Sequence, residues 1–199
     1  MDNIELNTMQ LDALKEVSNI GAGNAATSLS MLLGKTIDMT VPAVNIISLQ
    51  DIFDQNGEDL VCGIIVRVLG SIEGNVLIVF DKETAEDIVK RLTNGESEIT
   101  SDMGQSVLCE IANIISGSYM NAIAKLTNLL ITPSVPAVSY DMLGAILSTS
   151  FIEADQYDEQ ILDIETVFLN QNKENIGGHF YYIPKPGSLD KILKSIGIN

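Results

Sequence analysis

One short pattern of polar residues occurs twice in this chain of 199 residues. The copies are, in order, Asp12, Glu16, Asn19 and Pro42, and then Ser106, Glu110, Asn113 and Pro136, each residue 94 positions after its counterpart. Carboxylates, carboxamides and hydroxyls bind and orient reactants through hydrogen bonds. Packing alone does not explain a polar triplet at fixed spacing within apolar stretches, so the repeat predicts one site built twice.

The sequence lacks the partners that other kinds of catalytic site need. His179 is the only histidine, and we interpret it as a structural residue beside a strand. No Ser-His-Asp set is available to activate Ser106 as a nucleophile, and no Cys/His cluster indicates a metal site. A surface glutamate is usually only solvated. The recurrence of Glu16 and Glu110, each with an asparagine, is what favours a function for them.

Residues 21–26 match the dinucleotide-binding fingerprint G-x-G-x-x-A. That fingerprint requires a strand immediately before it, whereas residues 11–20 have a helical pattern. We therefore interpret these small residues as positions of close helix packing and predict no nucleotide site.

Both triplets lie on predicted long helices, at 11–33 and about 102–129, and Asp102 with Gln105 resembles a capping pair at the start of the second. At about 100° per residue, apolar residues form a stripe on each helix. The first stripe is Leu11, Leu14, Ala22, Ala25, Ala26, Leu29, Leu32 and Leu33, and the second is Leu108, Ile111, Ile115, Ala122, Leu126 and Leu129. The triplets lie away from these stripes, so we expect them to face solvent.

The remaining elements are predicted as strands and two short helices. The β-rich runs are 44–52, 60–70, 74–80, 144–154, 159–170 and 178–184, and the short helices are 82–93 and 188–196. Gly70, and Gly177 with Gly178, lie at positions where we expect turns. The segments most typical of loops are 94–105 and 171–178. Each half is thus helix, strands, helix, with neighbouring strands antiparallel.

An internal duplication accounts for this order. Residues 12–47 and 106–141 align without gaps at 11 of 36 identical positions, including VPAV at 41–44 and 135–138, and a weaker echo links 74–92 with 178–196. We predict a single domain spanning 1–199, with pseudo-repeats of about 8–93 and 102–197. The fold class is α/β of an α+β-like kind: a pseudo-two-fold, largely antiparallel sheet with two long motif helices and two shorter ones.

Composition limits the possible partners and location. A net charge of −16 with no Trp argues against nucleic acid and suits basic or mixed-charge proteins, although acidity also simply keeps a protein soluble. No apolar run approaches the roughly 20 residues of a membrane span, and the acidic N-terminus does not resemble a signal peptide. Cys62 and Cys109 are typical of reduced thiols. We expect a cytoplasmic protein without membrane insertion.

The doubled motif, D/S-x3-E-x2-N-x22-P, resembles the signature of the CheC/CheX/FliY family of chemotaxis phosphatases. The stretch at 10–30 is also similar to the first helix of CheC-like members. Two copies favour the CheC-like branch over CheX-like members, which have one. The chain ends near residue 199, which leaves no room for the extra C-terminal switch domain of FliY-like members.

The resemblance implies that the protein hydrolyses the aspartyl phosphate of the response regulator CheY. Asn19 and Asn113 would each orient a water in line with the phosphorus, much as a glutamine does in GTPases. Glu16 and Glu110 would pair with the receiver lysine and fix the docking register. The Mg²⁺ would come from phosphorylated CheY, so no cofactor of its own is implied.

The remaining motif residues are expected in supporting roles. Asp12 and Ser106 would complete the helix-face contact, and we assign Pro42 and Pro136 a structural role at a helix-to-strand transition. The family also implies binding to the receptor deamidase CheD, and we expect a monomer. The alternative is a non-catalytic adaptor, or a FliM-like binding module, for phosphorylated CheY or CheD.

Overall fold

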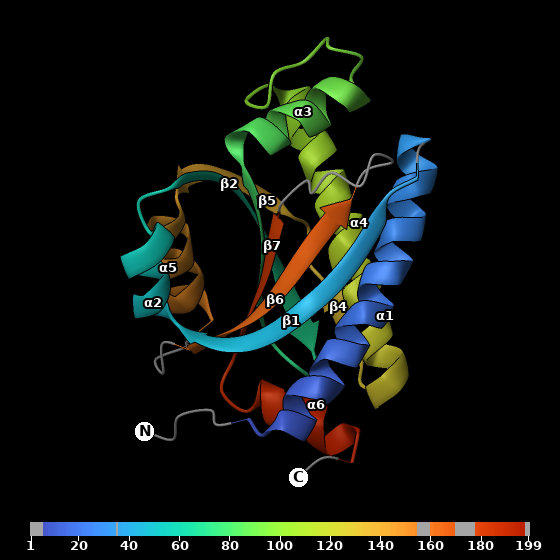
Figure 1. Ribbon diagram of the computed structural model, residues 1–199, viewed down its shortest axis with the longest axis vertical. Coiled ribbons are helices and arrows are strands. Elements are labelled where there is room, and N and C mark those ends of the chain that lie inside the picture. Colours follow the sequence, from blue (N-terminus) through green and yellow to red (C-terminus); the bar gives the residue numbers. More distant parts are fainter. Residues whose placement is uncertain (1–5, 35, 155–159, 170–177, 198–199) are drawn as a thin grey trace.

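The protein is described by a computed structural model that covers residues 6–34, 36–154, 160–169 and 178–197. Its helices lie on both faces of one seven-stranded sheet (Figure 1). The elements in chain order are α1 (Thr8–Leu33), β1 (Asp38–Ser48), α2 (Leu49–Asn56), β2 (Leu60–Gly70), β3 (Gly74–Asp81), α3 (Lys82–Leu92), α4 (Asp102–Thr127), β4 (Ile131–Pro133), β5 (Ala137–Met142), α5 (Leu143–Glu153), β6 (Gln160–Leu169), β7 (Gly178–Pro184) and α6 (Ser188–Ser195).

The sheet has the predicted pseudo-two-fold symmetry. Its order is β1-β6-β7-β3-β2-β4, with β5 also pairing with β2, and every pairing is antiparallel. The axis passes between β3 and β7, and the edge strand of each half pairs with a strand of the other half. The predicted fold class is therefore confirmed, with the two halves interlocked through their edges.

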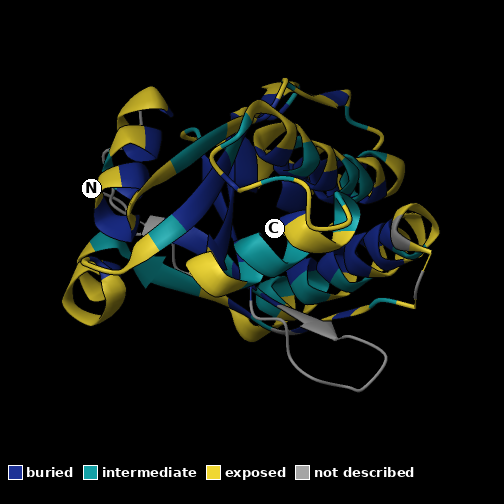
Figure 2. Cartoon of the chain, turned by 90° about the horizontal axis from the view of Figure 1, so that it is seen from above, coloured by how far each residue is buried: buried dark blue, intermediate teal, exposed yellow. Residues whose placement is uncertain are grey.

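The core lies on both faces of the sheet. One cluster joins α1, α3, α4 and α6 to the sheet, and a smaller cluster joins α2 and α5 to the other face. Seen from above, the strands between these layers are largely buried and the outer helix surfaces are exposed (Figure 2). Successive side chains of a strand point to opposite faces of the sheet, so one strand contributes to both clusters. In β3, for example, Ile78 belongs to the larger cluster and Val79 to the smaller one.

Two predicted strands are wrong in part or in whole. The run at 44–52 leaves the sheet at Ser48, whose hydroxyl accepts from the Asp51 amide in a capping box that begins α2. The run at 144–154 is helix α5, since a short apolar run does not by itself distinguish a buried helix from a strand. Gly144 lets α5 approach α2, because a Cβ there would lie 2.4 Å from Phe53 Cε1. The described residues thus form four short helices, not two, and they include two strands, β4 and β5, that the sequence did not predict.

Helix α1 begins three residues before its predicted start, and α4 begins at Asp102 as predicted but has a different cap. Asn7 and Gln10 form a capping box at the start of α1. The cap of α4 is Ser101, whose hydroxyl accepts from the Gly104 amide at 3.1 Å, and not Asp102. The apolar stripes are buried except near the helix ends, where Leu32 and Leu126 are exposed.

We expect Ser101→Ala to lower the free energy of unfolding by about 1 kcal/mol, because it removes the hydroxyl that caps α4. Asp102→Asn is the matched control, since it keeps the cap and removes only a first-turn charge, worth about 0.3–1 kcal/mol. Urea unfolding of both variants measures the difference. A larger loss of unfolding free energy in Asp102→Asn would indicate that Asp102, as predicted from the sequence, is the cap.

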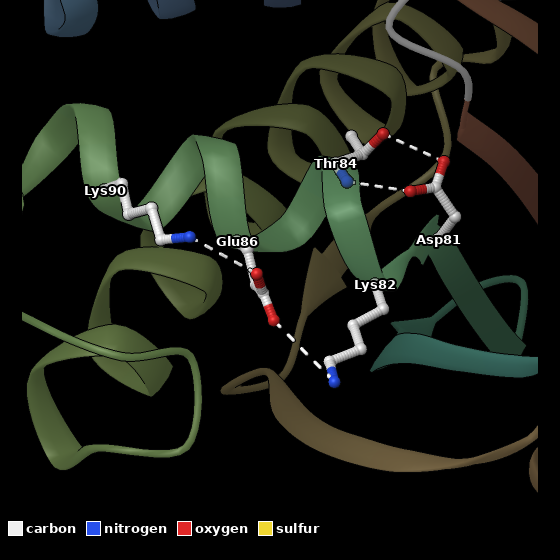
Figure 3. A network of polar contacts seen from close by, with 5 residues as sticks. All are labelled: Asp81, Lys82, Thr84, Glu86 and Lys90. Carbon is white, nitrogen blue, oxygen red and sulfur yellow. Dashed lines mark hydrogen bonds and ion pairs between the residues drawn. The ribbon is translucent and has the colours of Figure 1, made fainter.

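Helix α3 begins at a side-chain cap and carries ion pairs on its exposed surface (Figure 3). The Asp81 carboxylate accepts from the Thr84 amide at 2.7 Å and from its hydroxyl at 2.9 Å. Glu86 lies 3.8 Å from Lys82 Nζ and 3.3 Å from Lys90 Nζ. Exposed pairs of this kind contribute little to stability, so the Asp81 cap is the more important contact.

Among the described residues, α4 is the one helix long and apolar enough to meet the length and hydropathy of a membrane span. Its apolar side, however, packs into the larger core cluster through residues such as Leu108, Ile111 and Ile115, and core helices commonly meet the same criteria.

Both cysteines are free, and burial raises the pKa of the Cys62 thiol to about 11. The Cys62 thiol is therefore protonated at neutral pH and unreactive.

Candidate functional site

The two motifs lie on one pair of antiparallel helices, at opposite ends of the molecule. α1 begins beside α6 and α4 begins beside α3, and each motif occupies the first half of its helix (Figure 1). The helices touch closely at Gly21, where a Cβ would lie 3.0 Å from the Tyr119 backbone and ring. Small residues at 21–26 thus include a close helix contact, as the sequence predicted.

The side chains of the two polar triplets are exposed, with one exception. Asp12 and Glu16 on α1 are exposed, as are Ser106, Glu110 and Asn113 on α4. The Ser106 hydroxyl donates to the Asp102 carbonyl of its own helix at 2.8 Å. Asn19 is only half-exposed, because its carboxamide is engaged with the neighbouring edge strand.

Asn19 is hydrogen-bonded at both ends to the main chain of Val41. Its Oδ1 accepts from the Val41 amide at 3.0 Å, and its Nδ2 donates to the Val41 carbonyl at a longer 3.5 Å. No hydrogen bond to the Asn113 side chain is present within the described residues. The two asparagines occupy equivalent sequence positions but different local environments.

A β-bulge explains why Val41 needs a partner from a helix. From Thr40 to Ala43 strand β1 advances three residues while β6 advances two, from Val167 to Glu165. Val41 therefore has no ladder partner, and a carboxamide presents a donor and an acceptor as a neighbouring peptide would.

The equivalent segment of the second half has the same extra residue in a different conformation. Ser134 donates its amide to the Arg67 carbonyl, and its hydroxyl accepts from the Arg67 amide, both at 2.9 Å. Val135 then points outward at 86% exposed, whereas Val41 is 2% exposed. The contact between α4 and this segment comes from Cys109, whose thiol donates to the Pro136 carbonyl at 3.7 Å.

The assignment of the two prolines needs correction. Pro42 lies within β1, and Pro136 lies in the gap between β4 and β5, so both occur at the bulge of an edge strand and neither at a helix-to-strand transition. A residue without an N–H is tolerated where the ladder is already broken. The repeated VPAV therefore marks the bulge on which each motif helix lies.

One hollow of the described structure lies apart from the motif residues. A hollow of about 380 Å³ lies on the sheet face covered by α2 and α5, and is lined in part by Asp163, His179 and Tyr181. His179 stacks on Tyr181, and the Asp163 carboxylate, 3.8 Å from Nδ1, raises the pKa of His179. In the described ranges no group of three or more His, Cys, Asp or Glu side chains is placed to hold a metal ion.

Comparison with known proteins agrees with the doubled arrangement. Residues 9–46 and 103–140 match the CheC-like family, one match for each motif helix and its edge strand. The chain is 34% identical over 196 residues to the CheY-P phosphatase CheC of Bacillus subtilis, covering 94% of each chain. This chain belongs to the CheC-like family.

Two solved structures share its fold. FliY of Thermotoga maritima superposes with a TM-score of 0.80 at 24% identity, covering 98% of each chain. A CheX from Borrelia burgdorferi, solved in complex with CheY, BeF3 and Mg²⁺, has a TM-score of 0.50 at 19% identity, covering 83% of this chain and 96% of the other. At these identities the structural likeness establishes the fold alone.

Two features of the site were not predicted from the sequence. The contact between Asn19 and Val41 and the outward position of Val135 both depend on tertiary structure. The only sequence signal was the repeat of VPAV at the same spacing as the triplets. That repeat indicates the duplication, but it does not place a contact.

Proposed function

We propose that this protein is a phosphatase that hydrolyses the aspartyl phosphate of CheY. The observation that carries the proposal is an exposed Glu and Asn, one helical turn apart, on the second motif helix of a chain 34% identical to a CheY-P phosphatase over nearly its whole length. The fold alone does not carry it, because one fold hosts binding modules as well as enzymes.

The chemistry proposed for Asn113 is the positioning of water. Its exposed carboxamide oxygen accepts a hydrogen bond from a water and aims the water's lone pair at phosphorus. Attack forms the new P–O bond and breaks the bond to the aspartyl oxygen, so that inorganic phosphate leaves and the carboxylate is regenerated. An amide does this without becoming charged, and most of the rate gain comes from orientation.

The other motif residues are proposed to hold the two proteins together. Glu110 lies one helical turn before Asn113, and its carboxylate pairs with the lysine of the receiver, which places the carboxamide beside the phosphoryl group. Ser106 lies one further turn away on the same exposed face. Glu16 and Asp12 would act in the same way on α1. Mg²⁺ is part of the phosphorylated substrate protein, where it neutralises charge on the phosphoryl oxygens.

Phosphate release separates this proposal from a non-catalytic adaptor. A catalytic amount of the protein is expected to accelerate loss of phosphate from CheY-P over many turnovers. An adaptor would leave the rate unchanged or slow it by protecting the phosphoryl group. Binding to CheD, a monomeric state and a cytoplasmic location stay predictions.

We expect the purified protein to contain no stoichiometric metal and to leave small phosphate esters intact. Generic esters lack the receiver lysine and Mg²⁺ that complete the proposed site. Elemental analysis and an assay with a chromogenic phosphate ester measure both. A tightly bound metal together with broad esterase activity would indicate a self-contained metallophosphatase instead.

A further inference from the structure

The two motif copies differ in what their asparagine touches. Asn19 bonds both main-chain groups of Val41, at 3.0 and 3.5 Å. Asn113 has no such bond within the described chain, and the corresponding Val135 is turned away from the core. The same tetrapeptide, VPAV, thus adopts a closed and an open arrangement in one molecule.

We infer that the Asn113 site is open and that the Asn19 site is held closed by Val41. This inference rests on the proposed function, because it concerns the water-positioning role of the same two residues. We call the pair of bonds between Asn19 and Val41 the Val41 latch. While it is closed, the Asn19 Oδ1 accepts from a main-chain amide and the Nδ2 donates to the carbonyl of the same residue, so the carboxamide is directed at β1 and not at a docked phosphoryl group.

The bulge accounts for the latch staying closed. Opening would remove two hydrogen bonds and leave the Val41 amide unpaired beside a side chain that is only 2% exposed, and a buried unpaired amide is costly. If the bulge turned outward, as in the second half, the Val41 amide could bond to water. The Val41 side chain would then be exposed, and the free energy gained by burying it would be lost. Each route opposes release of Asn19.

The second half avoids this cost through Ser134. Its hydroxyl pairs with the Arg67 amide on β2, and the side-chain contact from α4 to this bulge comes from the Cys109 thiol at the Pro136 carbonyl, so Asn113 does not take part. The extra residue, Val135, is then free to face solvent, and Asn113 is left for another partner. Thr40 occupies the position of Ser134 in the first half, and it keeps a regular ladder pairing with Val167.

Amide hydrogen exchange tests the latch without any activity assay. Asn19→Ala is expected to speed exchange of the Val41 amide by about tenfold or more, the scale of one buried hydrogen bond. It is also expected to lower the thermal midpoint by roughly 2–6 °C. Asn113→Ala is the matched control and should change neither. Asn19→Asp, which keeps an acceptor for the Val41 amide, should restore much of the protection if Asn19→Ala folds poorly.

Binding and turnover of the single variants test which site is open. Titration with CheY carrying BeF3 and Mg²⁺ should shift amide resonances around Glu110 and Asn113, whereas docking at Glu16 should leave the Val41 amide protected from exchange, since the latch bears on the Asn19 carboxamide and not on docking. Asn113→Ala should lose about tenfold or more in turnover, a clearly larger loss than Asn19→Ala causes. Equal losses from the two single variants, or an unprotected Val41 amide in the wild type, would overturn the inference. If the wild type releases no phosphate from CheY-P, the proposed function fails while hydrogen exchange still decides the latch.

Discussion

Replacing both asparagines should reduce phosphate release from CheY-P on the order of a hundredfold. In Asn19→Ala/Asn113→Ala neither site retains a carboxamide to orient water, while Glu16 and Glu110 are left to dock the receiver. The measurement is the rate of phosphate release at a fixed, catalytic amount of each protein. Correction for the folded fraction is needed, because loss of the Asn19 contact with Val41 destabilises the first half.

A control separates loss of chemistry from loss of structure. Asn24 and Asn121 are exposed asparagines on the same two helices outside the motifs. Asn24→Ala/Asn121→Ala should therefore keep wild-type turnover. A motif double variant that is folded and turns over at the wild-type rate would remove the asparagines from the mechanism.

Replacing both glutamates should weaken docking onto phosphorylated CheY. If the pair between carboxylate and receiver lysine is desolvated in the complex, Glu16→Ala/Glu110→Ala loses about 2–5 kcal/mol of binding free energy. The loss is nearer 1 kcal/mol if water reaches the pair. Titration of the variant against CheY with BeF3 and Mg²⁺ measures the affinity directly.

The glutamate effect should be specific to the motif and sensitive to salt. Glu83 is another exposed helical glutamate outside the motif, so Glu83→Ala should bind normally. Added salt should weaken the wild-type complex more than the double variant, since screening acts on the charge pair. Unchanged affinity of the double variant would assign the glutamates another role.

The sequence was sufficient to predict the motif helices and the symmetry of the sheet. α1 and α4 contain no proline, their apolar residues recur at helical spacing, and the triplets lie in one register in both. Gly70, which the sequence places at a turn, ends β2 with a positive φ of 110°. These features are local in sequence, and hydrophobic periodicity reports them well.

Helix α5 was missed although the repeat contained the information. α2 begins at Leu49 and α5 at Leu143, which continues the 94-residue register of the motifs. The segment 144–154 is rich in apolar and hydroxyl residues and reads as a strand on composition. Its packing partner, Phe53 against Gly144, is about ninety residues away in the sequence, so local pattern could not reveal it.

The difference between the two sites could not be predicted from the sequence for a related reason. Val41 and Val135 are the same residue in the same tetrapeptide, yet one is buried and the other exposed. The choice depends on contacts with other elements: Ser134 pairs with Arg67 of strand β2 in one half, and Asn19 of helix α1 pairs with Val41 in the other. A repeat in sequence indicates equivalent positions, but it does not indicate equivalent environments.

The most direct test of water positioning is to separate binding from turnover in Asn19→Ala/Asn113→Ala. Phosphate release is followed across a range of CheY-P concentrations that saturates the wild type, and affinity is measured in parallel with CheY carrying BeF3 and Mg²⁺. Because the asparagines act on the water and not on docking, we predict affinity close to wild type with turnover at saturation reduced about a hundredfold. Wild-type turnover at saturation, with the whole defect in affinity, would contradict this account.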